Sequence, residues 1–205
     1  NFYSQAAEFP MTYYGQLAFN KINPGGNFEL KDESFFDKDY EKDFKKNKLI
    51  RHIILLEELN ATQLGKDIFN HLAGLNIEKG SEVLAAELAT SVERYDFAIQ
   101  ISKRASYEKR FYNKFNYPII PTPKIINNKV MPKSEVVLAI IRQESEFDKR
   151  ANSWAGARGM MQLMKYTAKI VAKQAKLPYS ISGLTRDPEY NIKLGSYYFN
   201  SLIED

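Results

Sequence analysis

One glutamate in the C-terminal half of the chain combines a reactive side chain with an unusual position. Val137, Ile140, Ile141 and Glu144 lie at i, i+3, i+4 and i+7, so on a helix they share one face. The pattern therefore predicts that Glu144 occupies a place where a hydrophobic residue is expected, and Phe147 would extend the same face. A buried carboxyl group without a partner tends to hold its proton, as a general acid must. Glu144 is thus the candidate catalytic residue.

Neighbouring charges leave a second interpretation of Glu144 open. At the end of a helix its side chain could reach water, or pair with Arg142 or Lys149. Glu146 is the rival carboxylate, but two residues along a helix turn the side chain by about 200°, so it faces away from Glu144. Nothing in the sequence places Asp148. Because paired-carboxylate glycosidases need a second acid across the sugar, the pattern favours a mechanism with a single carboxylate.

Other kinds of catalytic or cofactor site have little support. The chain has no cysteine, which excludes disulfides, thiolate metal sites and thiol nucleophiles. His52 and His71 are the only histidines, and neither belongs to a metal-binding motif. No phosphate loop, nucleophile elbow or dinucleotide fingerprint occurs. The sequence predicts neither a metal nor a cofactor.

The elements around Glu144 are expected to be helices joined by loops. Ser134 is a candidate N-cap for a helix that runs to about Ser145, with Glu135 in its first turn. The small residues of 151–159 predict a loop, and 156–159 read GARG, a tight turn. This turn could hold an anion, but its glycines favour close backbone approach beside the helix of Glu144.

Two more helices follow in the predicted order. One spans about Met160 to Gln174, and the other begins after Asp187 as N-cap, with Pro188 at the first helical position. The last helix carries an apolar stripe made of Leu194, Tyr198 and Leu202. These helices would surround the loop that follows Glu144.

The first half of the chain has the pattern of consecutive helices. Apolar residues recur at helical spacing in three segments: Ile50, Ile53, Ile54, Leu56 and Leu59; Val83, Leu84, Leu88 and Val92; and Phe97, Ile99 and Ile101. The proline-containing segment 116–128 (NYPIIPTPKIINN) interrupts this pattern. The prediction is an all-α or mainly α chain with a helical region of the superhelix type at 1–115 and a second domain at 116–205.

Composition and charge narrow the class of protein. The chain has 205 residues, a net charge of +4 and a pI near 9.0, which suits an anionic partner or a solvated surface with a small excess of cations. The segment 31–48 is dense in charges of both signs and is expected to be a solvated helix or loop. The longest aliphatic run, 136–141, is too short to cross a bilayer. No leader opens the chain, as in a secreted protein whose signal peptide has been removed.

Three sequence elements in order resemble the catalytic domain of the soluble lytic transglycosylases. The first element is IRQES at 141–145, with Ser153 nine residues after Glu144; the second is GARGMMQLM at 156–164; and the third is DPEYNI at 187–192, with LG at 194–195. The resemblance covers about 116–205. A weaker resemblance to the helical linker of these enzymes lies in 9–18 (FPMTYYGQLA), 101–105 (ISKRA) and 117–118 (YP).

The resemblance implies a lysozyme-like, α-rich fold and the cleavage of bacterial cell-wall glycan. Such an enzyme cuts the β-1,4 bond between N-acetylmuramic acid and N-acetylglucosamine without adding water. Glu144 matches the catalytic glutamate, which first protonates the glycosidic oxygen and then takes the proton of the muramoyl C6 hydroxyl as a 1,6-anhydro ring closes. The missing second acid is then explained, because the nucleophile belongs to the substrate.

The resemblance also implies roles for residues around Glu144. Ser153 would hydrogen-bond to the catalytic acid or to the sugar, and Gln162 and Met164 would contact the N-acetyl groups. For Met164, packing in the core is an equal alternative. Asn191, with Gly195 and Tyr198 on its face, fits a structural brace better than a substrate contact.

Location and partners follow from the same resemblance. We expect a periplasmic protein of a Gram-negative bacterium, with glycan strands as the main partner and other cell-wall enzymes as further candidates. The family continues into a segment containing Ala-Tyr-Asn-Ala-Gly, which is not found in the 205 residues, so one wall of the groove is expected to be missing. A hydrolytic muramidase, a non-catalytic wall-binding scaffold and a basic nucleic-acid binder are the alternatives; the last has no recognisable motif.

Overall fold

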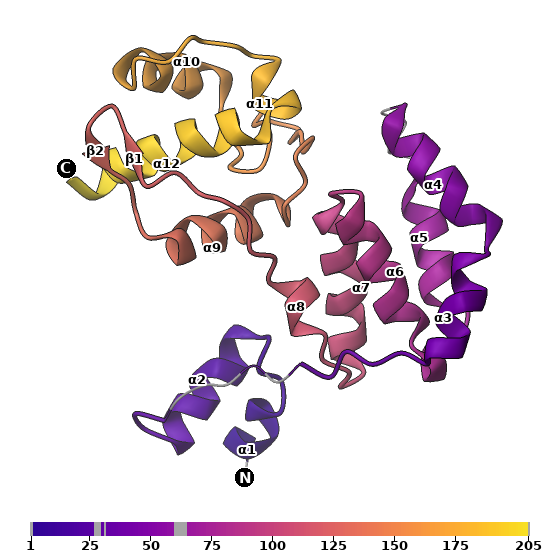
Figure 1. Cartoon of the computed structure of the whole chain (residues 1–205). Coiled ribbons are helices and arrows are strands. Elements are labelled where there is room, and N and C mark those ends of the chain that lie inside the picture. Colours follow the sequence, from indigo (N-terminus) through magenta and orange to yellow (C-terminus); the bar gives the residue numbers. More distant parts are fainter. Residues whose placement is uncertain (1, 27–29, 31, 60–64, 205) are drawn as a thin grey trace. The chain divides into compact units, whose positions relative to one another are not determined.

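The chain forms two compact units, each with its own hydrophobic core. The computed structural model describes residues 2–26, 30, 32–59 and 65–204. The units are Asn1–Pro118 and Ile119–Asp205, and the break between them lies inside the proline-containing segment 116–128 (Figure 1). Helices dominate both units, which confirms the predicted fold class.

The described part of the first unit consists of helices and the turns between them (Figure 1). In chain order the helices are α1 (Phe2–Ala7), α2 (Tyr13–Ile22), α3 (Lys38–Lys45), α4 (Lys48–Glu58), α5 (Gly65–Ala73), the 3-10 helix η2 (Ile77–Lys79), α6 (Ser81–Ser91), α7 (Tyr95–Tyr107) and α8 (Asn113–Asn116). Helix α6 packs against α5 and α7, and its small side chains Ala85, Ala86 and Ala89 are fully buried. Short side chains at these positions let the helix backbones approach one another.

The apolar patterns predicted where helices form more accurately than they predicted which side chains are buried. In α4 the side chain of Ile53 is fully buried, whereas Ile54 and, just past the helix, Leu59 are exposed. The apolar spacing therefore predicted the helix, but not which of its apolar side chains are buried. Phe97, Ile99 and Ile101 of α7 are all buried, as the pattern predicted.

The charged segment 32–48 contains α3 and is solvated, in agreement with the prediction. Asp37 caps this helix, because its Oδ1 accepts hydrogen bonds from the backbone amides of Asp39 and Tyr40, both at 2.8 Å. The hydrogen bonds from these amides, with that of Tyr40 as the largest cause, hold the pKa of Asp37 below its ordinary value. Ion pairs one turn apart, such as Lys42–Asp39 at 2.8 Å, follow along the exposed side.

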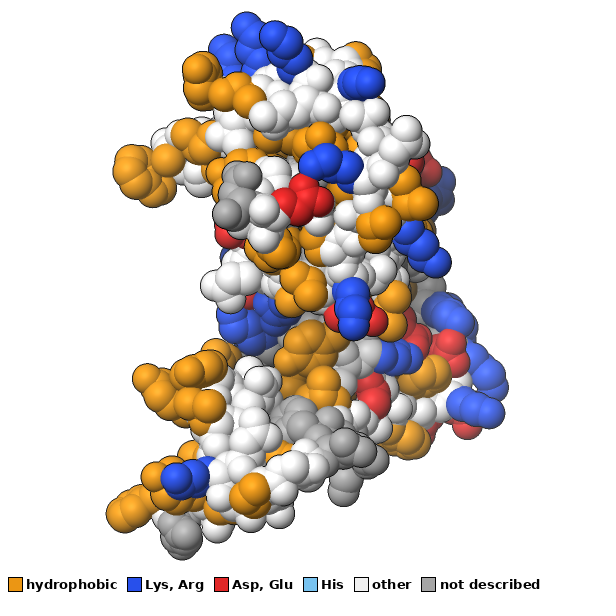
Figure 2. Space-filling view, turned by 90° about the vertical axis from the view of Figure 1, so that its left-hand side faces the viewer, with side chains coloured by type: hydrophobic (Ala, Val, Ile, Leu, Met, Phe, Trp, Pro, Cys, Tyr) orange, Lys and Arg blue, Asp and Glu red, His pale blue; other side chains and the backbone are white. Residues whose placement is uncertain are grey.

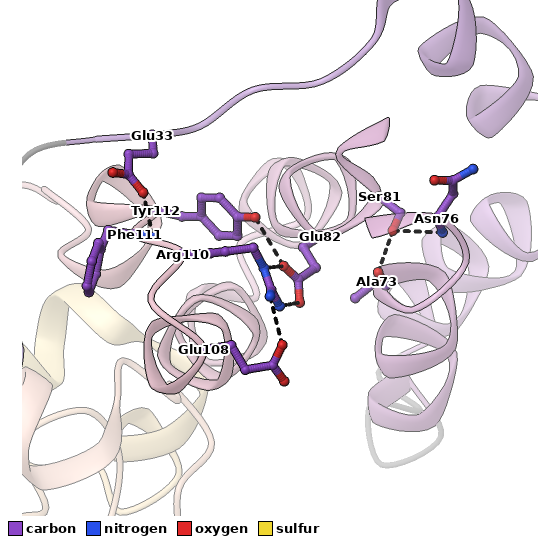
Figure 3. A network of polar contacts seen from close by, with 9 residues as sticks. All are labelled: Glu33, Ala73, Asn76, Ser81, Glu82, Glu108, Arg110, Phe111 and Tyr112. Atoms are coloured by element: carbon purple, nitrogen blue, oxygen red, sulfur yellow. Dashed lines mark hydrogen bonds and ion pairs between the residues drawn. The ribbon is translucent and has the colours of Figure 1, made fainter. Parts of the chain in front are cut away.

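A buried carboxylate, Glu82, joins α6 to the chain that follows α7 (Figure 3). Arg110 donates from Nε and Nη2 to the two oxygens of Glu82, at 3.0 and 3.1 Å, and Tyr112 Oη donates to Oε2 at 3.1 Å. Ser81, beside it, donates to the carbonyl of Ala73 and accepts from the amide of Asn76. Since three donors satisfy the Glu82 carboxylate, the cluster is best explained as a structural tie.

The same cluster predicts a loss of stability in alkali. The pKa of Tyr112 is raised to about 12, with burial of the Tyr112 hydroxyl group as the main cause and the negative charge of Glu82 as the second. A phenol whose pKa is higher in the folded state contributes stability below its unfolded pKa of about 10 and loses it as the pH rises toward 12. We expect this to remove up to about 2–3 kcal/mol of the free energy of unfolding. Urea unfolding followed by circular dichroism at pH 9 and pH 11.5 measures it.

The control for this prediction is Tyr112→Phe, which keeps the ring but cannot ionise. The other tyrosines titrate in both proteins, so the difference in pH dependence isolates Tyr112. Equal losses of stability in the wild type and in Tyr112→Phe would contradict the prediction.

The second unit begins with a short hairpin that the sequence did not predict. Strands β1 (Ile125–Ile126) and β2 (Lys129–Val130) pair antiparallel, with Ile125 opposite Val130. Asn127 and Asn128 form the turn with φ of 47° and 62°, the left-handed values that a tight type I′ hairpin turn needs and that asparagine tolerates. The turn lies at the end of the segment that interrupts the helical pattern.

Four helices follow the hairpin in the described part of this unit (Figure 1). They are α9 (Ser134–Ser145), α10 (Lys165–Gln174), α11 (Gly183–Arg186) and α12 (Pro188–Glu204). Helix α12 packs against α10 and α11, and the core includes the fully buried side chains of Ala168, Ala172, Leu184 and Leu194. The predicted stripe on α12 fades along the helix, since Leu194 is fully buried whereas Leu202 is exposed.

The predicted helix boundaries in this unit have mixed outcomes. Asp187 caps α12, since its Oδ1 accepts from the amide of Tyr190 at 3.0 Å, and Pro188 is the first helical residue, as predicted. The N-cap of α9 is Lys133, and the predicted cap Ser134 instead shares a hydrogen bond of 2.7 Å with Thr122. The predicted helix from Met160 begins only at Lys165, because tertiary hydrogen bonds hold the preceding residues in turns.

Candidate active site

Glu144 lies in the last turn of α9 and is exposed to solvent. Val137 and Ile141 on the same helix are fully buried, but the expected burial of Glu144 with them is wrong. The physical reason is that α9 ends one residue later. Glu146 and Phe147 both take left-handed conformations, with φ of 51° and 66°, and the chain turns so that Phe147 fills the core. Phe147 thus extends the buried face, as predicted, while Glu144 stands at its edge.

The charged neighbours of Glu144 are engaged with other groups. Arg142 donates from Nη1 to Glu146 Oε1 at 3.3 Å, and Asp148 Oδ1 accepts from the amide of Arg150 at 2.9 Å. In the part of the chain that the structure describes, the Glu144 side chain has no hydrogen bond or ion pair, so the alternative of pairing with Arg142 or Lys149 is wrong. The other alternative, a side chain that reaches water at the end of the helix, is the one observed, so Glu144 is an available carboxyl group just before the loop.

That loop, 151–163, folds into three short extended pieces that lie side by side. Antiparallel bridges join Asn152 to Arg158 and Arg158 to Leu163. Next to the bridge between Asn152 and Arg158, the amide of Gly159 donates to the carbonyl of Ala151 at 2.8 Å. The loop is tied to α9 by the residue after Glu144, since Ser145 Oγ donates to the carbonyl of Met160 at 2.8 Å. The base of the loop is thus held against the end of α9.

Asn191 on α12 holds the loop from the other side. Its side chain is fully buried; Oδ1 accepts from the amide of Met161 at 2.8 Å, and Nδ2 donates to the carbonyls of Arg158 and Leu184 at 2.9 and 3.0 Å. All three bonds are to backbone, so Asn191 is a brace, as predicted. They also explain why residues 160–163 do not begin a helix.

Gly159 makes this arrangement possible. Its φ is 72°, and a Cβ there would lie 2.0 Å from the carbonyl oxygen of Leu184 and 2.4 Å from Asn191 Nδ2. The predicted close approach is therefore present, but it is made to α11 and α12 rather than to the helix of Glu144. A Cβ at Gly156 would meet no other atom within 4 Å, so only the backbone conformation of the turn, with φ of 90°, requires this glycine.

Comparison with known proteins finds a family model that matches most of the second unit. Residues 123–205 match the family model of the Transglycosylase SLT domain. These residues are called the SLT domain, after the family model that they match. This match covers the hairpin, α9, the loop, α10, α11 and α12.

Relatives of the SLT domain are murein transglycosylases, where murein is bacterial cell-wall peptidoglycan. The chain is 41% identical over 73 residues to the soluble lytic murein transglycosylase of Escherichia coli, which covers 35% of this chain and 11% of that protein. The chain thus spans about a tenth of the length of this curated relative.

Solved structures share the fold over nearly the whole chain. The 70-kDa soluble lytic transglycosylase of Escherichia coli matches 98% of this chain and 32% of its own, with a TM-score of 0.75 and 22% identity. An inactive Glu-to-Gln variant of the lytic transglycosylase Slt of Pseudomonas aeruginosa matches the same shares with a TM-score of 0.72 and 22% identity. At this level of identity the likeness concerns the fold, which is the α-rich one that was predicted.

The predicted substrate residues lie on the loop of the SLT domain and just after it. Ser153 and Gln162 are half-buried, and Met164, next after Leu163, is 44% exposed. Ser153 Oγ accepts from the amide of Ala157 at 3.0 Å, and Gln162 Nε2 donates to the carbonyl of Gly159 at 2.8 Å. The fold thus brings these residues into one loop region at the end of α9, although no hydrogen bond between described residues joins any of them to Glu144.

Sequence reasoning missed two residues in this region. Ser145 provides the tie between α9 and the loop, and Trp154 at the tip of the loop is completely exposed. The signal that could have found Trp154 is that it is the only tryptophan of the chain and lies within the small-residue run 151–159. Its exposure could not be read there, since tryptophan is highly buried on average.

Neither a metal site nor a membrane span is found where the structure describes the chain. Within residues 2–26, 30, 32–59 and 65–204 no group of three or more His, Asp or Glu side chains could hold a metal ion. His52, on α4 of the first unit, shares a 2.8 Å contact between Nδ1 and the carbonyl of Lys48. None of the helices in these ranges combines the length and the hydropathy of a transmembrane segment.

Proposed function

We propose that this chain contains the catalytic part of a lytic murein transglycosylase. The observation that carries the proposal is Glu144, an exposed and unpartnered carboxyl group at the end of α9 in an SLT domain. The names of the relatives support the reaction, and the inactive Glu-to-Gln variant of the Pseudomonas enzyme supports a glutamate as the catalytic residue. The substrate is the glycan strand of murein, and the bond cleaved is the β-1,4 bond from N-acetylmuramic acid to N-acetylglucosamine.

Glu144 acts first as acid and then as base. A bound glycan covers the Glu144 carboxyl group and removes water from it. The carboxyl group protonates the glycosidic oxygen as the C1–O bond breaks. The resulting carboxylate takes the proton of the muramoyl C6 hydroxyl, whose oxygen bonds to C1 and closes the 1,6-anhydro ring. No water is consumed, and Glu144 is left protonated for the next cycle.

The atoms that the loop leaves available suit the N-acetyl groups of the substrate. Gln162 Nε2 is engaged with the carbonyl of Gly159, so Gln162 Oε1 is the atom that accepts from an N-acetyl N–H. Ser153 Oγ accepts from the amide of Ala157, and its proton remains to be donated to the sugar or to Glu144. The thioether of Met164, 44% exposed, contacts the N-acetyl methyl group. Packing in the core, the alternative for Met164, is less consistent with this exposure.

The remaining parts of the proposal concern the first unit and the place of action. The helices of the first unit form the linker region that precedes the catalytic domain in such enzymes. The protein acts in the periplasm of a Gram-negative bacterium after removal of a signal peptide, on glycan strands and with other cell-wall enzymes as candidate partners. The chain's positive net charge is compatible with a polymer that carries peptide carboxylates.

The decisive experiment is the digestion of purified murein with this chain and with the complete product of its gene, followed by mass spectrometry of the products. Muropeptides ending in 1,6-anhydro-N-acetylmuramic acid are expected. Reducing muramic ends without anhydro forms would instead establish a hydrolytic muramidase. Binding to murein without any cleavage by the complete product would establish a wall-binding scaffold.

A further inference from the structure

Hydrophobic side chains are common on the surface of this protein, so exposure alone does not define a site. Figure 2 shows them at many places among Lys and Arg side chains. Trp154 differs in degree, because it is 100% exposed and thus contributes no buried area to the fold. A tryptophan that stabilises nothing is available for a ligand, and its large rigid ring offers contact area with few rotatable bonds.

The turn that carries Trp154 is well ordered by hydrogen bonds. The amide of Ser153 donates to the carbonyl of Ala157 at 3.0 Å, and the amide of Ala157 donates back to Ser153 Oγ at 3.0 Å. The amide of Gly156 donates to the carbonyl of Ser153 at 2.9 Å, and its φ of 90° closes the turn. The indole is therefore presented by a closed turn at a defined place.

Two backbone or side-chain hydrogen bonds connect the end of α9, where Glu144 lies, to the loop that carries this turn. Ser145 binds the carbonyl of Met160, and Gly159, next to it, binds Ala151. Trp154 follows Ala151 by three residues, which corresponds to about 10 Å of extended chain. The indole thus stands a short distance from the base of the loop, which is fastened to the residue after Glu144.

The immediate neighbours of Trp154 indicate the kind of ligand. Residues 153–157 read SWAGA, so the indole is flanked by small, uncharged side chains. A pyranose ring presents an apolar face of C–H groups that an aromatic ring can cover. We propose that Trp154 is a saccharide platform, whose indole stacks on a pyranose ring of the glycan strand that is cleaved at Glu144. This inference rests on the proposed function and adds a sugar contact to it.

The single tryptophan of the chain makes the proposal directly measurable. The probes are chitohexaose, which is a neutral glycan without peptides, and a murein stem peptide without sugar. Titration of the full chain with chitohexaose is expected to shift the tryptophan emission to the blue in a saturable way, because the sugar displaces water from the indole. No shift is expected with the stem peptide. A shift with the peptide only, or none with either probe, would overturn the proposal.

Variants test the energetic importance of the platform. Trp154→Ala is expected to weaken binding to chitohexaose, measured by calorimetry, by about five- to tenfold, and Trp154→Phe by much less. The matched control is Tyr107→Ala, which removes another exposed aromatic ring, 66% exposed, from the first unit. Thermal unfolding should be unchanged by Trp154→Ala, since its side chain is fully exposed.

The outcomes separate this proposal from the proposed function. Formation of anhydro products at the wild-type rate and affinity by Trp154→Ala would overturn the platform and leave the function intact. A blue shift with chitohexaose in a protein that cleaves no murein would leave a glycan-binding site but remove the proposed reaction. Equal losses of affinity in Trp154→Ala and Tyr107→Ala would likewise count against the platform.

Discussion

Glu144→Gln is expected to reduce the rate of murein cleavage by about 10²–10⁴-fold while glycan binding persists. The amide has nearly the shape of the carboxyl group but can neither donate a proton to the glycosidic oxygen nor accept one from the C6 hydroxyl. Since Glu144 is exposed and makes no hydrogen bond or ion pair with the described part of the chain, the substitution should leave stability unchanged. Release of anhydro-muropeptides from sacculi measures the rate, and co-sedimentation with sacculi measures binding.

Glu146→Gln is the matched control, because it makes the same chemical change two residues along the chain. Glu146 is ion-paired with Arg142 and has a left-handed backbone, so its replacement should affect stability slightly and cleavage by no more than a few-fold. A Glu144→Gln protein that cleaves at the wild-type rate would remove Glu144 from the mechanism. A large loss of activity in Glu146→Gln alone would transfer the role to that carboxylate.

Asn191→Asp is expected to destabilise the SLT domain by about 3–5 kcal/mol at pH 7. Oδ1 could still accept from Met161, but the oxygen that replaces Nδ2 would face the carbonyls of Arg158 and Leu184 in a fully buried site. This would leave an uncompensated negative charge among acceptors. Urea denaturation followed by circular dichroism measures the free energy of unfolding.

The same variant should be sensitive to pH with a definite sign. A buried aspartic acid beside two carbonyls keeps its proton and so has a raised pKa in the folded state. Its protonated form can donate one hydrogen bond, so the variant is least destabilised below the unfolded pKa of about 4 and loses stability as the pH rises. Asn152→Asp, an exposed change in the same loop, is the control and should be nearly neutral at both pH values. Equal stability of the two variants at pH 7 would refute the role of Asn191 as a brace.

Local signals in the sequence predicted the elements that depend only on near neighbours. The start of α12 was predicted because Asp187 binds an amide three residues away and Pro188 has a preset φ. The helix of Glu144 was predicted because Val137 and Ile141 repeat at helical spacing. The start of α10 was missed, since the bond from Met161 to Asn191 spans 30 residues and no local pattern contains it.

The sequence by itself determined the resemblance to the soluble lytic transglycosylases through ordered motifs, the mainly helical fold class and Glu144 as the candidate catalytic residue. Only the tertiary structure decided that Glu144 is exposed, because two left-handed residues after α9 place Phe147 in the core instead. It also decided that Asn191 holds the loop and that Trp154 projects from it. The physical reason is that capping and periodicity are local, whereas burial and loop shape depend on contacts between residues distant in the chain.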